Sequence, residues 1–235
     1  SYKKTFADLH NFDVLAGYES YNLKLQELQG SNTKIYNPTI GELNNAIASP
    51  PRVASFTNEY TTMGYLARIQ YDYDEKYFVS ASYRRDASSR FHPDNRWGNF
   101  GSVGLAWLIN KENFMSNVSW IDMLKFKASY GIQGNDNLGN YYAYADQYSV
   151  TNSNGDFAVS FSYKGNKDIT WETSYAFNTG FDFELFGNRL NGTVEYFNRK
   201  TVDLLYNQPV PISMGYATIP MNVGSIVNQG IEVDL

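Results

Sequence analysis

Apolar and polar residues alternate with a period of two along most of this chain. The clearest stretch is residues 124–133, where polar, charged or small residues separate five apolar ones: Leu124, Phe126, Ala128, Tyr130 and Ile132. Successive side chains of a β-strand point to opposite faces, so this stretch predicts a strand with one apolar and one polar face.

The same alternation predicts an all-β, antiparallel chain. Eight segments are expected to be strands: 10–18, 63–72, 77–85, 98–108, 123–133, 173–184, 190–200 and 225–235. The connections 19–61, 86–97, 134–171 and 201–224 are long, and those at 72–76, 109–122 and 185–189 are shorter on average. We expect a small hairpin within 134–171 and a short helical turn within 109–122.

These lengths point to a membrane barrel. Strands of about 9–11 residues cross an outer membrane, and such barrels keep long loops outside and short turns inside. In an antiparallel chain the long connections all fall at one end. We therefore predict part of an antiparallel transmembrane β-barrel. The alternative is a secreted sugar-binding β-sandwich, because amphipathic strands also pack sheet on sheet.

The pattern also assigns faces within the predicted barrel. The residues expected to face lipid are Phe126, Ala128, Tyr130, Ile132, Tyr175, Phe177, Val194 and Tyr196. Those expected to face the lumen are Lys125, Lys127, Asn178, Asp182, Asn191 and Glu195.

Composition supports this class. Aromatic residues make up 17% of the 235 residues, which suits strands and the aromatic girdles of a barrel. The sequence has no apolar run of about 18 residues, so it predicts no transmembrane helix. The net charge is −5 and no basic stripe is present, so no nucleic-acid partner is expected. Cysteine is absent, which removes thiolate chemistry.

Six segments in order carry a resemblance to a known family. They are 83–91 (YRRDASSRF), 96–107 (RWGNFGSVGLAW), 124–135 (LKFKASYGIQGN), 169–173 (ITWET), 188–190 (NRL) and 222–232 (NVGSIVNQGIE). Together they resemble the SusC/RagA family of TonB-dependent outer-membrane transporters. Ala87 stands where the family usually has Gly, and Gly101 where it usually has Pro.

The resemblance implies a barrel of about 22 strands with a plugged lumen. Residues 1–235 would be a partial transmembrane β-barrel domain of central-to-late strands, with the plug, the TonB box and the closing strand outside the chain. Residues 1–6 lack the apolar core of a signal peptide, so a longer precursor is expected. The implied protein lies in the outer membrane of a Gram-negative cell and is no enzyme. Its implied partners are TonB, a SusD-like surface lipoprotein, and an oligosaccharide or peptide cargo.

Two groups of residues are candidates for function. Aromatic rings in or near the segment 134–171 offer faces on which sugars stack: Tyr141, Tyr142, Tyr144, Tyr148 and Trp171. Loop packing or a membrane girdle is the alternative for them. The family-motif loop comprises Arg85, Asp86, Ser88, Ser89, Arg90 and Phe91, which we expect to hold itself together by charge-assisted hydrogen bonds. Contact with the lipoprotein or with lipopolysaccharide phosphates is the alternative there.

No cofactor and no catalytic site are expected. His10 and His92 are the only histidines, and neither lies in a pattern typical of a triad or a metal site. The oxygen-rich segments 72–76 and 135–139 are weighed as structural calcium sites. Polar turns are the preferred interpretation of both.

Overall fold

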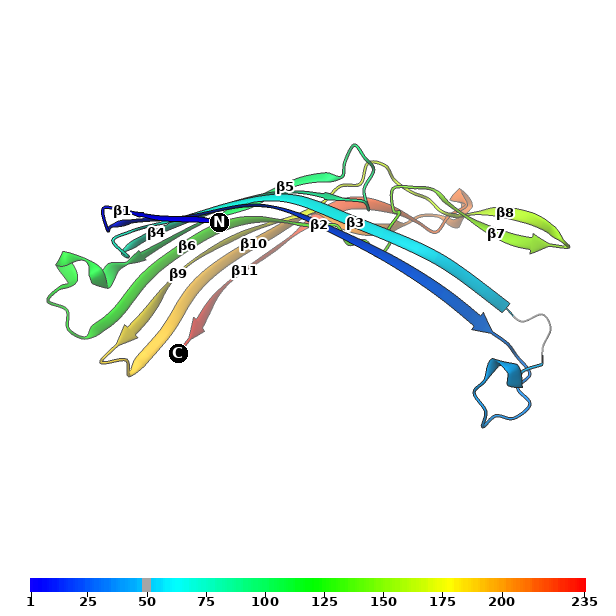
Figure 1. Cartoon of the computed structure of the whole chain (residues 1–235), viewed down its shortest axis with the longest axis horizontal. Helices are drawn as coiled ribbons and strands as arrows, with labels where there is room; N and C mark the ends of the chain where they lie inside the picture. The colour runs from blue at the N-terminus through cyan, green and yellow to red at the C-terminus, as the bar shows by residue number, and fades with distance from the viewer. Residues whose placement is uncertain (48–51) are drawn as a thin grey trace.

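The computed structural model describes residues 1–47 and 52–235, and most of them lie in one arched antiparallel sheet (Figure 1). Its nine strands are β1 (Tyr2–Phe6), β2 (His10–Ser31), β3 (Arg52–Tyr73), β4 (Tyr77–Ser88), β5 (Trp97–Leu108), β6 (Ile121–Asn135), β9 (Glu172–Leu185), β10 (Leu190–Pro209) and β11 (Thr218–Asp234). Each pairs with the strand before it in this order, as in a meander.

A second, two-stranded sheet stands apart from the first. It is a hairpin of β7 (Gln147–Ser153) and β8 (Asp156–Tyr163), inserted between β6 and β9. The hairpin lies at the right of Figure 1, at the same end as residues 32–47 and the connection 210–217. The connections 74–76, 109–120 and 186–189 lie at the opposite end. We call these the outer and inner ends, following the loop-length rule for barrels.

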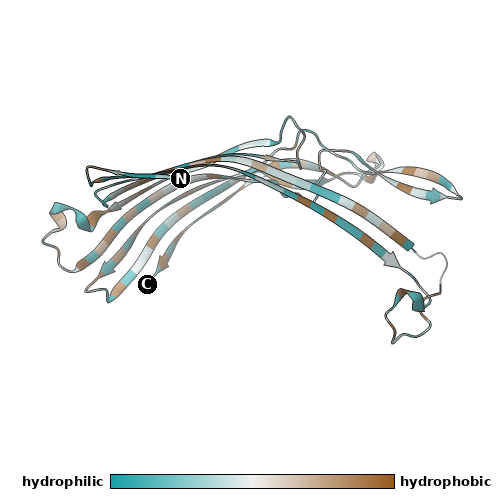
Figure 2. Cartoon of the chain, viewed as in Figure 1, coloured by the Kyte–Doolittle hydropathy of each residue, from teal (hydrophilic) through white to brown (hydrophobic). Residues whose placement is uncertain are grey.

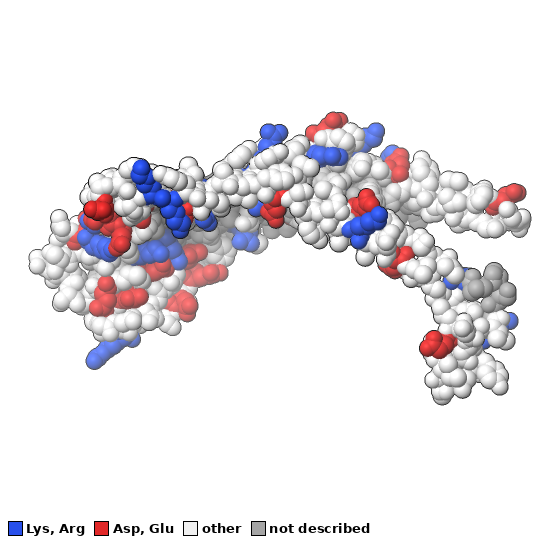
Figure 3. All heavy atoms as spheres, in the orientation of Figure 1, with Lys and Arg blue, Asp and Glu red and all other residues white. Residues whose placement is uncertain are grey.

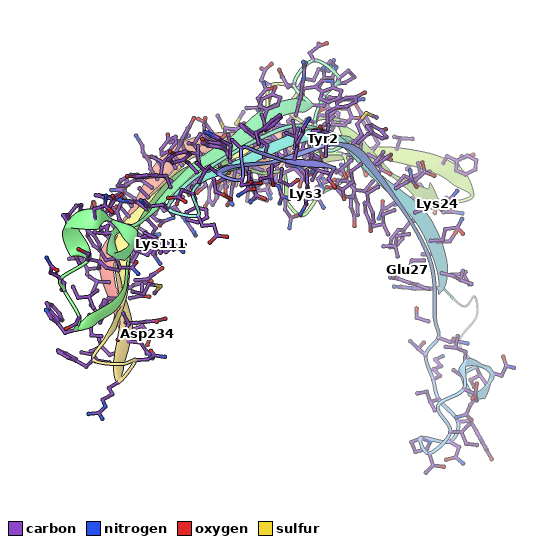
Figure 4. The ribbon with its side chains drawn as sticks, turned by 60° about the vertical axis from the view of Figure 1, so that its left-hand side comes forward. Tyr2, Lys3, Lys24, Glu27, Lys111 and Asp234 are labelled. Atoms are coloured by element: carbon purple, nitrogen blue, oxygen red, sulfur yellow. The ribbon has the colours of Figure 1, made fainter. Side chains whose placement is uncertain are left out.

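The strand register confirms which of the predicted residues share a face. Lys127 on β6 forms ion pairs with Asp182 on β9 at 2.9 Å and with Glu195 on β10 at 3.0 Å, so these three side chains share one face. On the other face Tyr130 lies opposite Phe177, and both rings are exposed. In the edge-on view of the arch, Lys3 and Glu27 lie on its concave side (Figure 4).

The concave face is hollow and polar. A space of 700 Å³ is lined there by residues from eight strands, among them Lys3, Gln70, Ser80, Lys127 and Asn178. The alternation of hydropathy along each strand is visible in Figure 2. Only four hydrophobic residues of the described chain are buried, and none fills a space between two sheets. The β-sandwich alternative is therefore wrong for the described residues.

Two details differ from the sequence prediction. Strands β2, β3, β10 and β11 extend well into the segments 19–61 and 201–224, which we expected to be loops. Backbone pairing continues there in unbroken register from Tyr18–Tyr65 to Ser31–Arg52. The apolar positions of β2 change face on the way, from Val14, Ala16 and Tyr18 to Tyr21, Leu23 and Leu25. The strand β1 was not predicted at all. Residues 48–51, within the first of those expected loops, lie outside the described residues.

Two smaller expectations are confirmed. The hairpin β7–β8 lies within 134–171, and two 3₁₀ turns, Ile109–Lys111 and Asn113–Met115, lie within 109–122. Within the described residues, no helix is long and apolar enough to cross a membrane.

Candidate functional site

The carboxylate of Asp136 connects the family-motif loop to the outer end of the sheet. Its Oδ2 accepts hydrogen bonds from Ser88 Oγ at 2.6 Å and from Tyr60 Oη at 2.7 Å. Its Oδ1 pairs with Arg90 Nη1 at 3.2 Å. These four residues come from β3, the end of β4, the loop after β4, and the loop after β6. We call them, with Tyr141, the outer clasp.

Arg90 is held on three sides in this clasp. Its guanidinium lies over the ring of Tyr60 at 4.5 Å and over that of Tyr141 at 5.2 Å, a stacking geometry favourable for a cation. Nη1 also donates to the backbone oxygen of Asp136 and to Asn137 Oδ1. Burial, followed by the hydrogen bond to the Asp136 carboxylate, raises the pKa of Tyr60 to about 12, so its hydroxyl remains a donor at neutral pH.

Phe91, next to the clasp, anchors a small hydrophobic cluster under the outer loops. It is 1% exposed and packs with Ala143 and Ile169, which are equally buried. The ring of Trp171 lies 5.4 Å from that of Phe91, and its Nε1 donates to the Arg96 carbonyl at 3.0 Å. This cluster and the clasp together tie residues 136–171 to the loop after β4.

The remaining motif residues serve other contacts. On the concave face, Asp86 accepts two hydrogen bonds from Arg84, at 3.1 and 3.2 Å, and Arg84 also pairs with Glu19. Arg85 points to the opposite face, where its guanidinium lies 5.1 Å from the ring of Trp97. Ser89 Oγ accepts from the backbone N–H of Thr61. Every polar member of the motif loop is therefore in a hydrogen bond or a cation–π contact within the chain.

The candidate aromatic residues do not form one surface. Tyr141 stacks on Arg90, and the hydroxyl of Tyr142 accepts from the backbone N–H of Glu59 at 3.0 Å. Trp171 belongs to the cluster around Phe91. Tyr148 is 61% exposed on the hairpin, with its edge against Phe161.

Tyr144 lines a hollow, and Trp171 lines two smaller ones beside Arg84 and Asp86. The hollow beside Tyr144 has a volume of 640 Å³ and contains His92, Asp146, Lys164, Asn166 and Lys167. The carboxylate of Asp146 accepts from Lys164 Nζ at 3.1 Å and from the backbone N–H of Gly165 at 2.9 Å. These two donors, with Lys164 the stronger, lower the pKa of Asp146 below the ordinary value for aspartate.

Metal-ligating side chains do not gather in the described chain: no group of three or more His, Cys, Asp or Glu is placed to hold an ion. His10 Nδ1 lies 2.9 Å from the hydroxyl of Tyr71, and His92 Nδ1 lies 3.2 Å from Asp94. In the segment 135–139, both oxygens of Asp136 face the donors of the outer clasp. Sequence reasoning placed Asp136 in a polar turn, with a calcium site as the alternative, and missed its pairing with Arg90.

The sequence matches, over residues 2–235, the family described as TonB dependent receptor-like, beta-barrel. The chain belongs to this family. It is 37% identical to TonB-dependent receptor P39 of Formosa agariphila over all of this chain and 23% of that protein. It is 30% identical to TonB-dependent receptor SusC of Bacteroides thetaiotaomicron over 96% of this chain and 23% of that protein.

Solved structures agree with this membership. The RagAB peptide transporter superposes with a TM-score of 0.89 and 28% identity, over 99% of this chain and 26% of that chain. The SusC/RagA resemblance predicted from the motifs is therefore confirmed, and so is the all-β barrel fold. This TonB-dependent receptor chain spans about a quarter of the length of the relatives it matches.

Proposed function

We propose that the chain is the central-to-late part of the barrel of an outer-membrane TonB-dependent importer in a Gram-negative cell. The whole protein takes up oligosaccharides, or else peptides, together with a SusD-like surface lipoprotein. The observation that carries this proposal is the match along the full chain to receptors and transporters of the SusC/RagA type. TonB would act through a segment outside residues 1–235. The plug would also lie outside them.

The division of faces supports transport through the barrel. Exposed aromatic and aliphatic side chains occupy the convex face, as lipid requires, while charged and amide groups line the concave hollow. The protein is expected to move its cargo without bond-breaking chemistry, because its relatives are named as receptors and transporters.

For the cargo we favour an oligosaccharide, with first contact in the hollow beside Tyr144. A sugar presents a C–H face that covers an aromatic ring, and hydroxyls that pair with amides and charged groups. Tyr144 offers such a ring, and Asn166 and Lys167 offer the donors. Tyr141, Tyr142 and Trp171 would act indirectly, by holding the loops that shape this hollow. The alternative cargo is a peptide, because the RagAB protein that superposes on this chain is a peptide transporter.

Gene deletion in the native host tests the function. The strain without the full-length protein is grown separately on starch, xylan, alginate oligosaccharides and a casein digest. We expect the loss of growth on one polysaccharide, restored by the intact gene but not by a copy that lacks the TonB-interacting segment. Normal growth on all polysaccharides with a defect on the digest would favour peptide import. Growth unchanged on every substrate would contradict an importer of either kind.

Tyr144→Ala tests the cargo contact in the complemented strain. Removing a ring that covers a sugar costs buried apolar area worth roughly 1–2 kcal/mol, or about tenfold in affinity. Binding of the polysaccharide that supports growth is measured on the purified complex, with Tyr36→Ala as the control, because Tyr36 is exposed in a different outer loop. Equal binding by both variants and the wild type would remove Tyr144 from the cargo site.

A further inference from the structure

The convex face of the sheet changes from apolar to polar along a definite row of residues. Lys3 lies on the concave side of the arch (Figure 4), and its ion pair with Asp13 at 3.2 Å places that residue of β2 on the same side. Side chains alternate along a strand, so the even-numbered residues of β2 lie on the convex face. The last apolar one of the inner half is Tyr18, which pairs with Tyr65 of β3.

Beyond this row the convex contacts between β2 and β3 are polar. Asn22 Nδ2 donates a hydrogen bond to Thr61 Oγ1 at 2.8 Å, and Lys24 forms an ion pair with Glu59 at 3.4 Å. Both charged side chains are more than half exposed. Charged groups are unfavourable in hydrocarbon, so these residues belong in water. The lipid-facing belt therefore ends, on the outer side, at the row of Tyr18 and Tyr65.

Arg85 lies in this boundary row. It pairs with Tyr65 on one side and with Asn99 on the other. Its guanidinium lies 5.1 Å from the ring of Trp97, which stacks on the ring of Tyr65 with centroids 6.3 Å apart. Tyr18 and Tyr65 are more than half exposed, and Tyr and Trp are typical of the interface between lipid and water. Arg85 is therefore at the level of the lipid headgroups.

The convex face of the central strands carries cations and no anions. Among the paired positions of β4, β5, β6, β9 and β10, the convex ones include Arg85 and Lys200 but no Asp or Glu. Within the described residues, neither cation forms an ion pair with a carboxylate. Along the convex outline of the arch in Figure 3, uncharged atoms cover most of the stretch between the inner end and the loop after β4.

The parts of the protein outside residues 1–235 do not lie next to Arg85. Strand β4 is flanked by β3 and β5 over its paired length, so no further strand of a barrel fits beside it. A plug would fill the concave side, which is the opposite face of the sheet. The convex face of a membrane barrel meets lipid. The anion that reaches Arg85 must therefore come from the membrane.

We propose that Arg85 binds the phosphate group of a lipid in the outer leaflet. A guanidinium matches phosphate oxygens through parallel N–H donors, and the ring of Trp97 supports it from one side. The exposed rings of Tyr65 and Tyr83, on the same face, would contact the acyl chains. The inference rests on the proposed function for the outer-membrane location alone. The phosphate comes from lipopolysaccharide or from a glycerophospholipid, and the experiment separates these two sources.

Binding is measured on the full-length protein, purified in mild detergent, with fluorescent lipid A as the probe. The competitors are lipid A, its dephosphorylated form, phosphatidylglycerol and inorganic phosphate. Arg85→Gln removes the charge, and Arg85→Lys keeps the charge but not the forked donors. Arg68→Gln is the matched control, because Arg68 is an exposed residue of β3 that alternates with the convex residue Ala67 and so lies on the concave face. A heat-modifiable band on a gel shows that each variant is folded.

We expect Arg85→Gln to weaken the binding of lipid A by about tenfold, because a hydrogen bond between charged groups contributes roughly that factor. Arg85→Lys should weaken it less, and Arg68→Gln should leave it unchanged. The wild-type protein should bind dephosphorylated lipid A about as weakly as Arg85→Gln binds lipid A. Tighter binding of lipid A than of phosphatidylglycerol supports the site with lipopolysaccharide as the source, and the reverse order supports it with a glycerophospholipid.

Three results would overturn the site. They are equal losses from Arg85→Gln and Arg68→Gln, equal binding of lipid A and its dephosphorylated form, and displacement of the probe by inorganic phosphate as effectively as by lipid A. The last would assign Arg85 to free phosphate. Membrane fractionation is done first. A wild-type protein absent from the outer membrane would contradict the proposed function, whereas a protein that reaches the outer membrane without preferring phosphorylated lipid would contradict this inference alone.

Discussion

At the scale of single residues, Asp136 shows how one carboxylate organises the outer end. It is bound by donors from residues 46 to 76 positions away in the chain, all converging on its two oxygens. The side chains of Arg90 and Asp136 are each 14% exposed, so their pair is much less screened than a surface ion pair. A charge-assisted hydrogen bond in such a setting contributes more to stability than a hydrogen bond between neutral groups.

Asp136→Asn should therefore loosen the outer loops without unfolding the barrel. The change removes the charge that Arg90 faces, at a cost of about 2 kcal/mol. Hydrogen exchange on the full-length protein should show residues 136–146 opening about thirtyfold faster. Asp156→Asn, at the exposed hairpin tip, is the matched control and should leave the same peptides unchanged. Equal exchange in both variants would mean that the clasp does not hold the loop.

Neighbouring positions on β6 test the face assignment. Ala128 lies midway along the strand and shares the face of Tyr130, whereas Ser129 next to it shares the face of Lys127. Ala128→Lys should lower the free energy of unfolding of the full-length protein in liposomes by about 2–4 kcal/mol, the cost of a cation near the lipid midplane. Ser129→Lys should change it little, because that side chain reaches the polar hollow. Urea titration measures both, and equal effects would refute the assignment.

At the scale of elements, strand length and hairpin geometry depend on backbone pairing more than on side-chain pattern. Strands β2 and β3 pair over 22 residues, about twice the length that a membrane crossing needs. The outer half is held by the backbone hydrogen bonds between the two strands, with added cross-strand contacts such as Lys24–Glu59 at 3.4 Å. An isolated ion pair at this exposure contributes little to stability. The backbone hydrogen bonds between the two strands therefore contribute most.

The base of the β7–β8 hairpin should respond to acid through Asp146. Its pKa is lowered in the folded protein by Lys164 and by the Gly165 N–H, so the stabilisation is complete above the ordinary aspartate value. It is lost only as the pH falls through the lowered value. Hydrogen exchange of residues 147–165, corrected for intrinsic rates, should be constant from pH 7 to about pH 4 and rise below that. Asp146→Asn should abolish this acid-dependent rise, and a rise that persists would assign it elsewhere.

At the scale of the whole molecule, the arch has no packed interior of its own. Within the described residues, β1 covers one edge of β2 only through His10–Val14, and β11 ends the sheet on the other side. Unpaired backbone groups cost several kcal/mol each in lipid. The sheet is therefore stabilised in a membrane only when further strands continue both edges and a plug or water fills the concave side.

Residues 1–235 expressed alone should accordingly fail to form a stable barrel in detergent. The full-length protein should run as a heat-modifiable band on a gel, whereas the isolated segment should aggregate or run as unfolded chain whether heated or not. The open edges are the physical reason, because they pair readily with other copies. A folded, heat-modifiable form of the isolated segment would show that it closes by itself and would contradict the partial-barrel proposal.

The sequence by itself determined those features that depend on residues close together in the chain. Period-two alternation specified eight strands and both faces of β6, β9 and β10, because register in a sheet is decided by which side chains meet lipid or water. The ordered motifs identified the family. In the outer half of β2 the alternation changes phase, with Tyr21, Leu23 and Leu25 at odd positions after Val14, Ala16 and Tyr18 at even ones, so a single continuous strand was not expected there.

Only the tertiary structure decided the contacts between distant segments. The motif specified that Arg90 belongs to a charged loop, but not that Asp136 on another loop is its partner or that Tyr60 and Tyr141 enclose it. The tertiary structure also separated the candidate tyrosines. Most of them contact other loop residues, whereas Tyr144 lines a hollow. Such pairings depend on how the strands bring loop ends together in space, and no local pattern encodes that distance.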